Sequence, residues 1–136
     1  MTCSALADLW SRFLDIVFGE RYVEMLEEVT SVSLSSIRRT ATIWESRSGD
    51  FLAPHVDKPD KALTQIFYLT ERWTESGGGR LLIQSTPYSG QAVCKLAPTA
   101  GASAVLVRPN SSWHAVEESF TDIPRRSLNV TFWSTG

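Results

Sequence analysis

Three side chains that bind metals well stand at the ends of predicted strands, in distant parts of the chain. His55 and Asp57 are two residues apart in the segment PHVDKPDK, and side chains at that spacing in a strand point to the same face. The one other histidine of the chain is His114, in SSWHAVEE. Taken alone, a His-x-Asp pair more often lies on the surface. Together, two imidazoles and one carboxylate on one side of a metal leave other positions open, as at non-haem Fe(II) or catalytic zinc.

A second group of candidates lies in the last predicted strand, PRRSLNVTFW. One face of this strand carries Arg125, Ser127, Asn129, Thr131 and Trp133, and the other carries Arg126, Leu128, Val130 and Phe132. If the apolar face packs against the N-terminal helices, the Arg125 face lines the interior. A guanidinium that points inward needs an anion, and a bound dicarboxylate would supply one. The alternative is that both arginines are solvent-facing charges ahead of an ordinary strand.

Two further segments bear on a ligand site. Thr64, Ile66 and Tyr68 share one strand face, and the Tyr68 phenol is able to donate a hydrogen bond to the same carboxylate, although an aromatic residue in a β core is more often simple packing. The Gly77–Gly79 run lacks the Lys-Ser/Thr pair of a phosphate-binding loop and precedes a strand. It therefore predicts close approach of backbone at a sheet turn rather than a phosphate site.

The N-terminal part predicts two helices. Apolar residues recur at three- and four-residue spacing, with Ser4 as the expected N-cap and Gly19 as the expected stop. The residues expected on this face are Leu6, Leu9, Trp10, Phe13, Ile16 and Val17. A second helix is predicted from about Glu20 to Glu28, with Val23, Met25 and Leu26 buried.

From Ser31 onward, short β-branched and aromatic segments alternate with turn signals, a pattern typical of an all-β body. The predicted strands are 40–45, 51–56, 63–70, 80–84, 92–96, 104–108, 114–117 and 127–133. Such a set favours a mainly β fold, a double-stranded β-helix (a cupin-like jelly roll) with the N-terminal helices packed on one sheet. An eight-stranded lipocalin-like barrel is the alternative, but it does not explain where the polar residues stand.

Composition sets limits on the class of protein. The 136 residues suit one domain, 1–136, with residues of about 4–28 helical and about 40–134 forming the jelly-roll core. The formal net charge of -2 gives no basic field for nucleic acid. Cys3 and Cys94 are too few for a disulfide framework, and no segment looks like a membrane span or a secretion signal. We expect a cytoplasmic protein with reduced cysteines.

Four segments in order resemble the Fe(II)/2-oxoglutarate-dependent dioxygenases, specifically the prolyl-4-hydroxylase-like branch. They are SGDFLAPHVDKPDK, LTQIFYLTERWTESGGGRLLI, SAVLVRPNSSWHAVEES and RRSLNVTFW, from about Ile43 to Trp133. The closing segment matches the Arg-x-Ser-Leu strand of that family. Any one of these matches is weak, whereas four at the right spacing form a strong signal. One departure is TIWES, which has Trp44 and Glu45 where many relatives have a tyrosine near the cofactor.

The resemblance implies roles for individual residues. His55, Asp57 and His114 would bind Fe(II), Arg125 would bind the tail carboxylate of 2-oxoglutarate, and Tyr68 and Ser127 would lie beside it. The implied cofactors are Fe(II), 2-oxoglutarate as cosubstrate, and O2, with ascorbate as a candidate reductant. An intact Asp57 favours hydroxylation over halogenation, because related halogenases have a small residue there.

The substrate is less constrained by the sequence. We expect hydroxylation of a small molecule, such as an amino acid or biosynthetic intermediate, with release of succinate and CO2. The alternatives are a protein prolyl hydroxylase, which would act on a proline-containing peptide, and a non-catalytic cupin-like metal-binding module. Lys58 and Lys61 are candidates to meet an acidic substrate, although solvated loop lysines are commoner. We expect no nucleic acid or membrane partner, and the sequence does not predict the oligomeric state.

Overall fold

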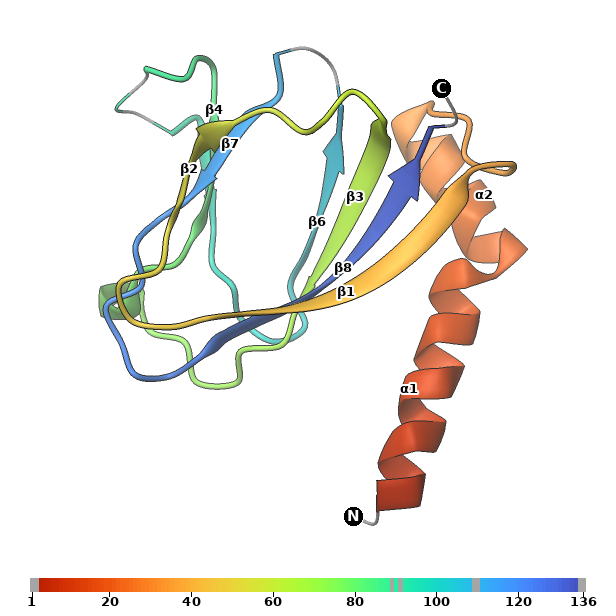
Figure 1. Ribbon diagram of the computed structural model, residues 1–136, viewed down its shortest axis with the longest axis horizontal. Coiled ribbons are helices and arrows are strands. Elements are labelled where there is room, and N and C mark those ends of the chain that lie inside the picture. The colour runs from red at the N-terminus through yellow and green to blue at the C-terminus, as the bar shows by residue number, and fades with distance from the viewer. Residues whose placement is uncertain (1–2, 89, 91, 109–110, 135–136) are drawn as a thin grey trace.

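Two four-stranded antiparallel sheets face each other in the computed structural model, which describes residues 3–88, 90, 92–108 and 111–134 (Figure 1). In order across the first sheet, the strands are β1 (Arg38–Ser46), β8 (Arg125–Trp133), β3 (Lys61–Tyr68) and β6 (Ser103–Val107). In the second sheet they are β2 (Leu52–His55), β7 (Trp113–Val116), β4 (Leu81–Gln84) and β5 (Cys94–Leu96). This is the predicted jelly roll with its eight predicted strands, and the alternative of a single lipocalin-like barrel is wrong.

Both helices cover the outer face of the first sheet (Figure 1). They are α1 (Cys3–Phe18) and α2 (Glu20–Thr30), separated at Gly19 as predicted, and a short 3-10 helix, η1 (Glu75–Gly77), precedes β4. Apolar residues of both helices pack against the sheet residues that face them. The buried members of this core are Val17, Val23, Leu26, Leu34, Leu63, Val130 and Phe132.

The buried face of each helix differs in part from the face that the sequence predicted to be buried. Leu9, Ile16 and Met25 are exposed, whereas Phe13 packs edge-on against Phe67 of β3. The apolar stripes are wider than the buried surfaces, because only the part of each stripe nearest the sheet finds a partner. Helix α1 already includes Cys3 and Ser4, so Ser4 is not its N-cap; the Leu6 side chain lies outside the described residues.

Strand β8 lies between β1 and β3 and separates the helical core from the space between the sheets. Leu128, Val130 and Phe132 are buried, with Val130 and Phe132 in the helix-packed core. The alternate residues from Arg125 to Trp133 line a pocket on the other side. The predicted facing of this strand is therefore confirmed, and it is the main reason that polar groups collect between the sheets.

None of the helices in the described part of the chain is long and apolar enough to cross a membrane. Cys94 is a free, exposed cysteine.

Candidate metal and cosubstrate site

Three predicted ligands meet on one side of the space between the sheets. His55 ends β2, Asp57 follows in the next loop, and His114 lies opposite His55 in the register of β2 and β7. The candidate ligand atoms of these three residues all lie within 4.8 Å of one another. The two imidazole ring centroids are 4.2 Å apart. A strand-end residue, a loop residue and a cross-strand partner thus form one cluster of the facial-triad type.

Both histidines are oriented by nearby backbone. His55 Nδ1 lies 2.9 Å from the carbonyl oxygen of Ala53, and His114 Nδ1 lies 3.0 Å from that of Ser112. A carbonyl oxygen only accepts, so each Nδ1 donates and each Nε2 keeps its lone pair for a ligand bond. Burial lowers the pKa of His114 and so favours this neutral form. A neutral imidazole with a free Nε2 atom is the donor that a divalent metal requires.

The carboxylate is held by a loop with several fixed contacts. Lys61 Nζ donates to Asp57 Oδ1 at 2.7 Å, and Arg108 Nε donates to the Asp57 carbonyl oxygen at 3.2 Å. The sequence left open whether Lys58 and Lys61 are solvated loop lysines; Lys61 is not, because it binds Asp57, whereas Lys58 is exposed in the loop. A β-bulge between Lys61 and Leu63 causes the difference. Leu63 packs in the helical core, and the extra residue turns Lys61 to the pocket side instead.

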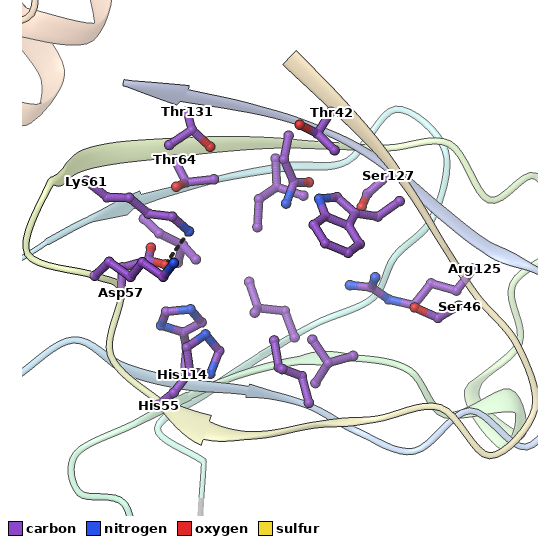
Figure 2. A pocket seen from close by; sticks show the side chains of 18 of the residues that line it. Thr42, Ser46, His55, Asp57, Lys61, Thr64, His114, Arg125, Ser127 and Thr131 are labelled. Atoms are coloured by element: carbon purple, nitrogen blue, oxygen red, sulfur yellow. Dashed lines mark hydrogen bonds and ion pairs between the residues drawn. The ribbon is translucent and has the colours of Figure 1, made fainter. Parts of the chain in front are cut away.

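The triad lies at one end of a pocket of ≈ 650 Å³ between the two sheets (Figure 2). Arg125 lies at the other end, next to Ser127 and Ser46. Thr64 and Thr131 lie beside Lys61 at the triad end, and Thr42 lies further toward Ser127. The pocket thus has three candidate metal ligands at one end and a buried cation at the other, and its volume is in the range of small-molecule sites.

The Arg125 side chain is buried and has no acidic residue as an ion-pair partner in the described part of the chain. It is 8% exposed, and its Nε donates to the carbonyl oxygen of Gly79 at 2.8 Å. Among the described residues no Asp or Glu forms an ion pair with it. Burial lowers the pKa of Arg125, although the nearby Tyr68 opposes this shift. A buried guanidinium with no anionic partner in the protein indicates an anionic ligand.

Arg126 has the opposite environment. It is exposed, and its Nε donates to Glu45 Oε2 at 2.9 Å, at the rim of the pocket. The structure therefore separates the two adjacent arginines as the sequence predicted, with Arg125 inside the pocket and Arg126 outside.

Other buried polar atoms near the pocket also lack a partner. Tyr68 is 1% exposed and the Arg125 guanidinium lies 5.2 Å from its ring centroid. Within the described residues, Tyr68 Oη, Thr64 Oγ1 and Asn129 Oδ1 have no hydrogen-bond partner. Buried polar atoms are seldom left unpaired, so Thr64 and Asn129, which line the pocket, fit a polar ligand, whereas Tyr68 lies beside Arg125 and is not among the lining residues. Burial raises the pKa of Tyr68, which keeps the phenol protonated and able to donate.

The Gly77–Gly79 run supports Arg125 rather than binding a ligand. Gly79 has φ +71, and a Cβ there would lie 3.1 Å from Arg125 Cδ. At Gly78 a Cβ would lie 2.1 Å from the Glu118 carbonyl oxygen. The predicted close approach of backbone is confirmed, and at Gly79 it leaves room for the Arg125 side chain.

The mouth of the pocket is partly apolar. Trp44, Phe51 and Leu52 line it and are exposed, with Trp44 at 57%. Trp44 faces Ser127 in the register of β1 and β8. The TIWES segment therefore brings an indole to the pocket. Trp113 and Trp73 are not among the residues that line it.

The profile of the 2OG-Fe(II) oxygenase superfamily matches residues 41–134 of this sequence, which is more than half of the chain. The chain belongs to that superfamily. Its members use Fe(II), 2-oxoglutarate and O2. The residues in the pocket fit these groups, since two free imidazole nitrogens and a carboxylate suit Fe(II) and the unpaired Arg125 suits a carboxylate.

Solved structures of the same fold are similar over most of this chain. A prolyl-4-hydroxylase from Pseudomonas putida has a TM-score of 0.63 at 21% identity, over 82% of this chain and 60% of that one. A 2OG-Fe(II) oxygenase family oxidoreductase from Burkholderia pseudomallei has a TM-score of 0.67 at 18% identity, over 91% and 57%. A prolyl hydroxylase from Trichoplax adhaerens, in complex with a hypoxia inducible factor peptide fragment, has a TM-score of 0.60 at 18% identity, over 71% and 44%.

At these identities the likeness is one of fold. The chain covers less than two thirds of the length of each of these three proteins. No curated protein sequence matches this chain.

Proposed function

We propose that this chain is an Fe(II)- and 2-oxoglutarate-dependent oxygenase that hydroxylates an unactivated C–H bond of a small molecule, such as an amino acid or biosynthetic intermediate. The observation that carries the proposal is the buried, acid-free Arg125 in the same pocket as the His55, Asp57 and His114 cluster. Three metal-ligating side chains alone would suit many metalloproteins. The same three side chains with an unpaired guanidinium at the other end of the pocket suit a metal-chelating acid that has a second carboxylate.

The proposed roles follow from these contacts. His55, Asp57 and His114 hold the iron through two Nε2 atoms and a carboxylate oxygen. Arg125 pairs with the tail carboxylate of 2-oxoglutarate, with Tyr68 donating a hydrogen bond and Ser127 beside it. Gly79 fixes the Arg125 side chain through its carbonyl oxygen. The chain thereby orients the cosubstrate, because both of its ends are held by groups that are positioned in advance.

When bound, iron supplies the oxygen-activating redox chemistry. The reaction balances as one O2, one 2-oxoglutarate and one C–H bond giving succinate, CO2 and an alcohol. One oxygen atom enters the new carboxylate of succinate and the other enters the C–H bond. Ascorbate as a reductant, a cytoplasmic location and a single domain over residues 1–136 remain predictions.

The pocket supports a small-molecule substrate. Its ≈ 650 Å³ lies within the range of ligand sites, roughly 300–1,000 Å³, and it must hold the cosubstrate as well. Part of its wall consists of short hydroxyl-bearing and amide side chains that suit a polar compound, and aliphatic residues form the rest. The polar residues are Thr40, Thr42, Thr64, Asn129 and Thr131, and the aliphatic ones are Ile66, Leu81, Leu106 and Val116.

A prolyl hydroxylase of proteins is the second candidate. It is favoured by the similar structures from Pseudomonas putida and Trichoplax adhaerens, the latter with a peptide bound. The exposed Trp44 and Phe51 at the mouth would then contact a proline-containing peptide. Succinate formation that depends on such peptides, and not on small molecules, would favour this candidate.

The test of the proposed function is an anaerobic titration of the apoprotein with Fe(II) and then 2-oxoglutarate. We expect the visible charge-transfer band of the chelated pair to saturate, and to be lost in His114→Ala. Admission of O2 should then produce succinate with the correct substrate. Iron binding without the band would instead support a non-catalytic cupin-like metal-binding module.

A further inference from the structure

A second cation, Lys61, lies at the opposite end of the pocket from Arg125 (Figure 2). Its side chain is 24% exposed and its ammonium group lies 5.9 Å from the centroid of the Trp133 ring. Asp57 Oδ1, at 2.7 Å, is its one hydrogen-bond acceptor among the described residues. Lys61 therefore depends on a single carboxylate, and the proposed function assigns that same carboxylate to iron.

The charges at the site do not balance once the cofactors are bound, a step that rests on the proposed function. The two positive charges of Fe(II) and the one of Arg125 are matched by the two negative charges of 2-oxoglutarate and the one of Asp57. Both histidines are neutral as ligands. Lys61 then adds one positive charge beyond this balance while it shares the Asp57 carboxylate with the metal, and a partly buried charge without an anion of its own is costly.

The other acids at the pocket have partners of their own. Glu45 accepts hydrogen bonds from Arg47 and Arg126, and Asp50 accepts one from the Arg47 backbone N–H at 2.8 Å. Lys58, exposed at the same end as Lys61, adds further positive charge. Among the described residues, Asp57 is the one acid that forms an ion pair with Lys61, so a second anionic partner would have to come from a ligand.

The wall beside Lys61 suits the rest of a polar ligand. Thr64 Oγ1 and Asn129 Oδ1 are buried without a hydrogen-bond partner in the described chain, and both residues line the pocket together with Thr131. Thr131 faces Thr64 in the register of β8 and β3. A hydroxyl or amino group next to the anion would satisfy these atoms.

We propose that Lys61 binds a carboxylate of the substrate, so that the molecule oxidised is a small carboxylic acid. The substrate carboxylate and the tail of 2-oxoglutarate then occupy opposite ends of the pocket, each on its own cation. The β-bulge that turns Lys61 away from the helical core is the structural feature that creates this second anion site.

The experiment uses the full chain loaded anaerobically with Fe(II) and saturating 2-oxoglutarate, so that Arg125 is already occupied. Monocarboxylates from acetate to 3-phenylpropanoate are titrated by calorimetry, each paired with its neutral amide. We expect at least one acid to bind saturably and its amide to bind more weakly. In Lys61→Met the acid should lose about 10- to 100-fold in affinity, the value of a hydrogen bond to a charged group.

Two matched variants make the test specific. Lys61→Arg keeps the charge and should retain most of the preference for acids. Lys95→Met removes a half-exposed lysine of β5 that does not line the pocket, and it should change nothing. The charge-transfer band at saturating Fe(II) verifies that each variant still binds iron and cosubstrate.

The results separate this inference from the proposed function. Absence of the band in the unaltered protein would overturn both. A normal band would overturn the inference alone if no acid bound saturably, if amides bound as well as acids, or if Lys61→Met left the preference unchanged. A rise in the 2-oxoglutarate requirement in Lys61→Met, without one in Arg125→Ala, would also overturn it, because Lys61 would then hold the cosubstrate.

Discussion

Two adjacent arginines, one position apart on β8, have different environments and therefore different proposed roles. Arg125 and Arg126 have the same chemistry, but strand alternation buries the first in the pocket and leaves the second in contact with Glu45 at the surface. Exposed ion pairs contribute little, whereas a buried charge needs a partner. The consequences of removing each side chain should therefore differ in kind.

We predict that Arg125→Ala leaves Fe(II) binding intact and raises the 2-oxoglutarate concentration for half-saturation by about 10- to 100-fold. Arg126→Ala should have no such effect. Both are measured from the charge-transfer band under anaerobic conditions. A larger effect in Arg126→Ala would mean that the facing of β8 is wrong.

Tyr68→Phe should separate stability from binding. The Tyr68 hydroxyl is buried without a partner in the described residues, so its removal should leave the apoprotein as stable or more stable, by up to about 1 kcal/mol. The same change removes a donor to the cosubstrate carboxylate and should weaken 2-oxoglutarate binding by about tenfold. Urea denaturation and the band titration measure the two effects. A less stable apoprotein with unchanged 2-oxoglutarate binding would show that the hydroxyl has a structural role only.

At the scale of elements, alternation and turn chemistry predicted all eight strands and the inner face of β8. The sequence placed Lys61 in a loop before this strand, whereas Lys61 belongs to β3, and a β-bulge between Lys61 and Leu63 turns its side chain to the pocket side. A bulge has no clear signal in a single sequence. Met25 was misplaced for a related reason, since periodicity shows an apolar stripe but not how much of it another element covers.

Gly79→Ala should impair the cosubstrate site through the backbone. The positive φ and the Cβ contact with Arg125 should destabilise the fold by about 1–2 kcal/mol and displace the guanidinium, raising the 2-oxoglutarate requirement. Gly101→Ala is the matched control, because Gly101 has φ +89 but a Cβ added there would meet nothing within 4 Å. It should lose comparable stability with normal 2-oxoglutarate binding. Equal losses of binding in both variants would point to general destabilisation.

Glu27 joins α2 to the segment that leads into β1. Its carboxylate accepts the backbone N–H groups of Leu34 and Ser35 and the Ser35 hydroxyl. The Leu34 hydrogen bond, with those from Ser35, lowers the pKa of Glu27 below 4.5. A lowered folded-state pKa contributes stability above the unfolded-state pKa, and that stability is lost as the pH falls through the folded value.

We therefore predict that Glu27→Gln lowers the free energy of unfolding at pH 7, and that its difference from the unaltered protein shrinks as the pH falls below about 4.5. Chemical denaturation over a pH series measures this. Glu24→Gln, at an exposed position of the same helix, is the matched control for the effect of replacing a glutamate there. A constant difference for Glu27→Gln across the series would contradict the proposed charge effect.

At the scale of the molecule, the two sheets divide the site between them. The second sheet and the loop that leaves it carry His55, Asp57 and His114, and the first sheet carries Arg125. A ligand that binds the folded state alone stabilises it by about 2.7 kcal/mol at a concentration 100 times its Kd. Fe(II) should therefore raise the Tm, and 2-oxoglutarate should raise it further only when the metal is present.

Anaerobic thermal unfolding with and without a chelator measures this order of effects. Asp57→Ala should abolish the shift caused by Fe(II). A shift with 2-oxoglutarate alone, as large as the one with iron present, would show that the anion binds independently of the triad.

The hydrogen bond from Arg125 Nε to the Gly79 carbonyl oxygen has one more consequence. Gly79 lies shortly before β4, so this bond ties a side chain of the first sheet to the segment that enters the second. The two sheets then fix the distance between the metal site and the guanidinium, and the pocket discriminates between 2-oxo diacids by the length of their carbon chain. Oxaloacetate, one carbon shorter than 2-oxoglutarate, and 2-oxoadipate, one carbon longer, should both bind the iron-loaded protein less tightly than the five-carbon acid.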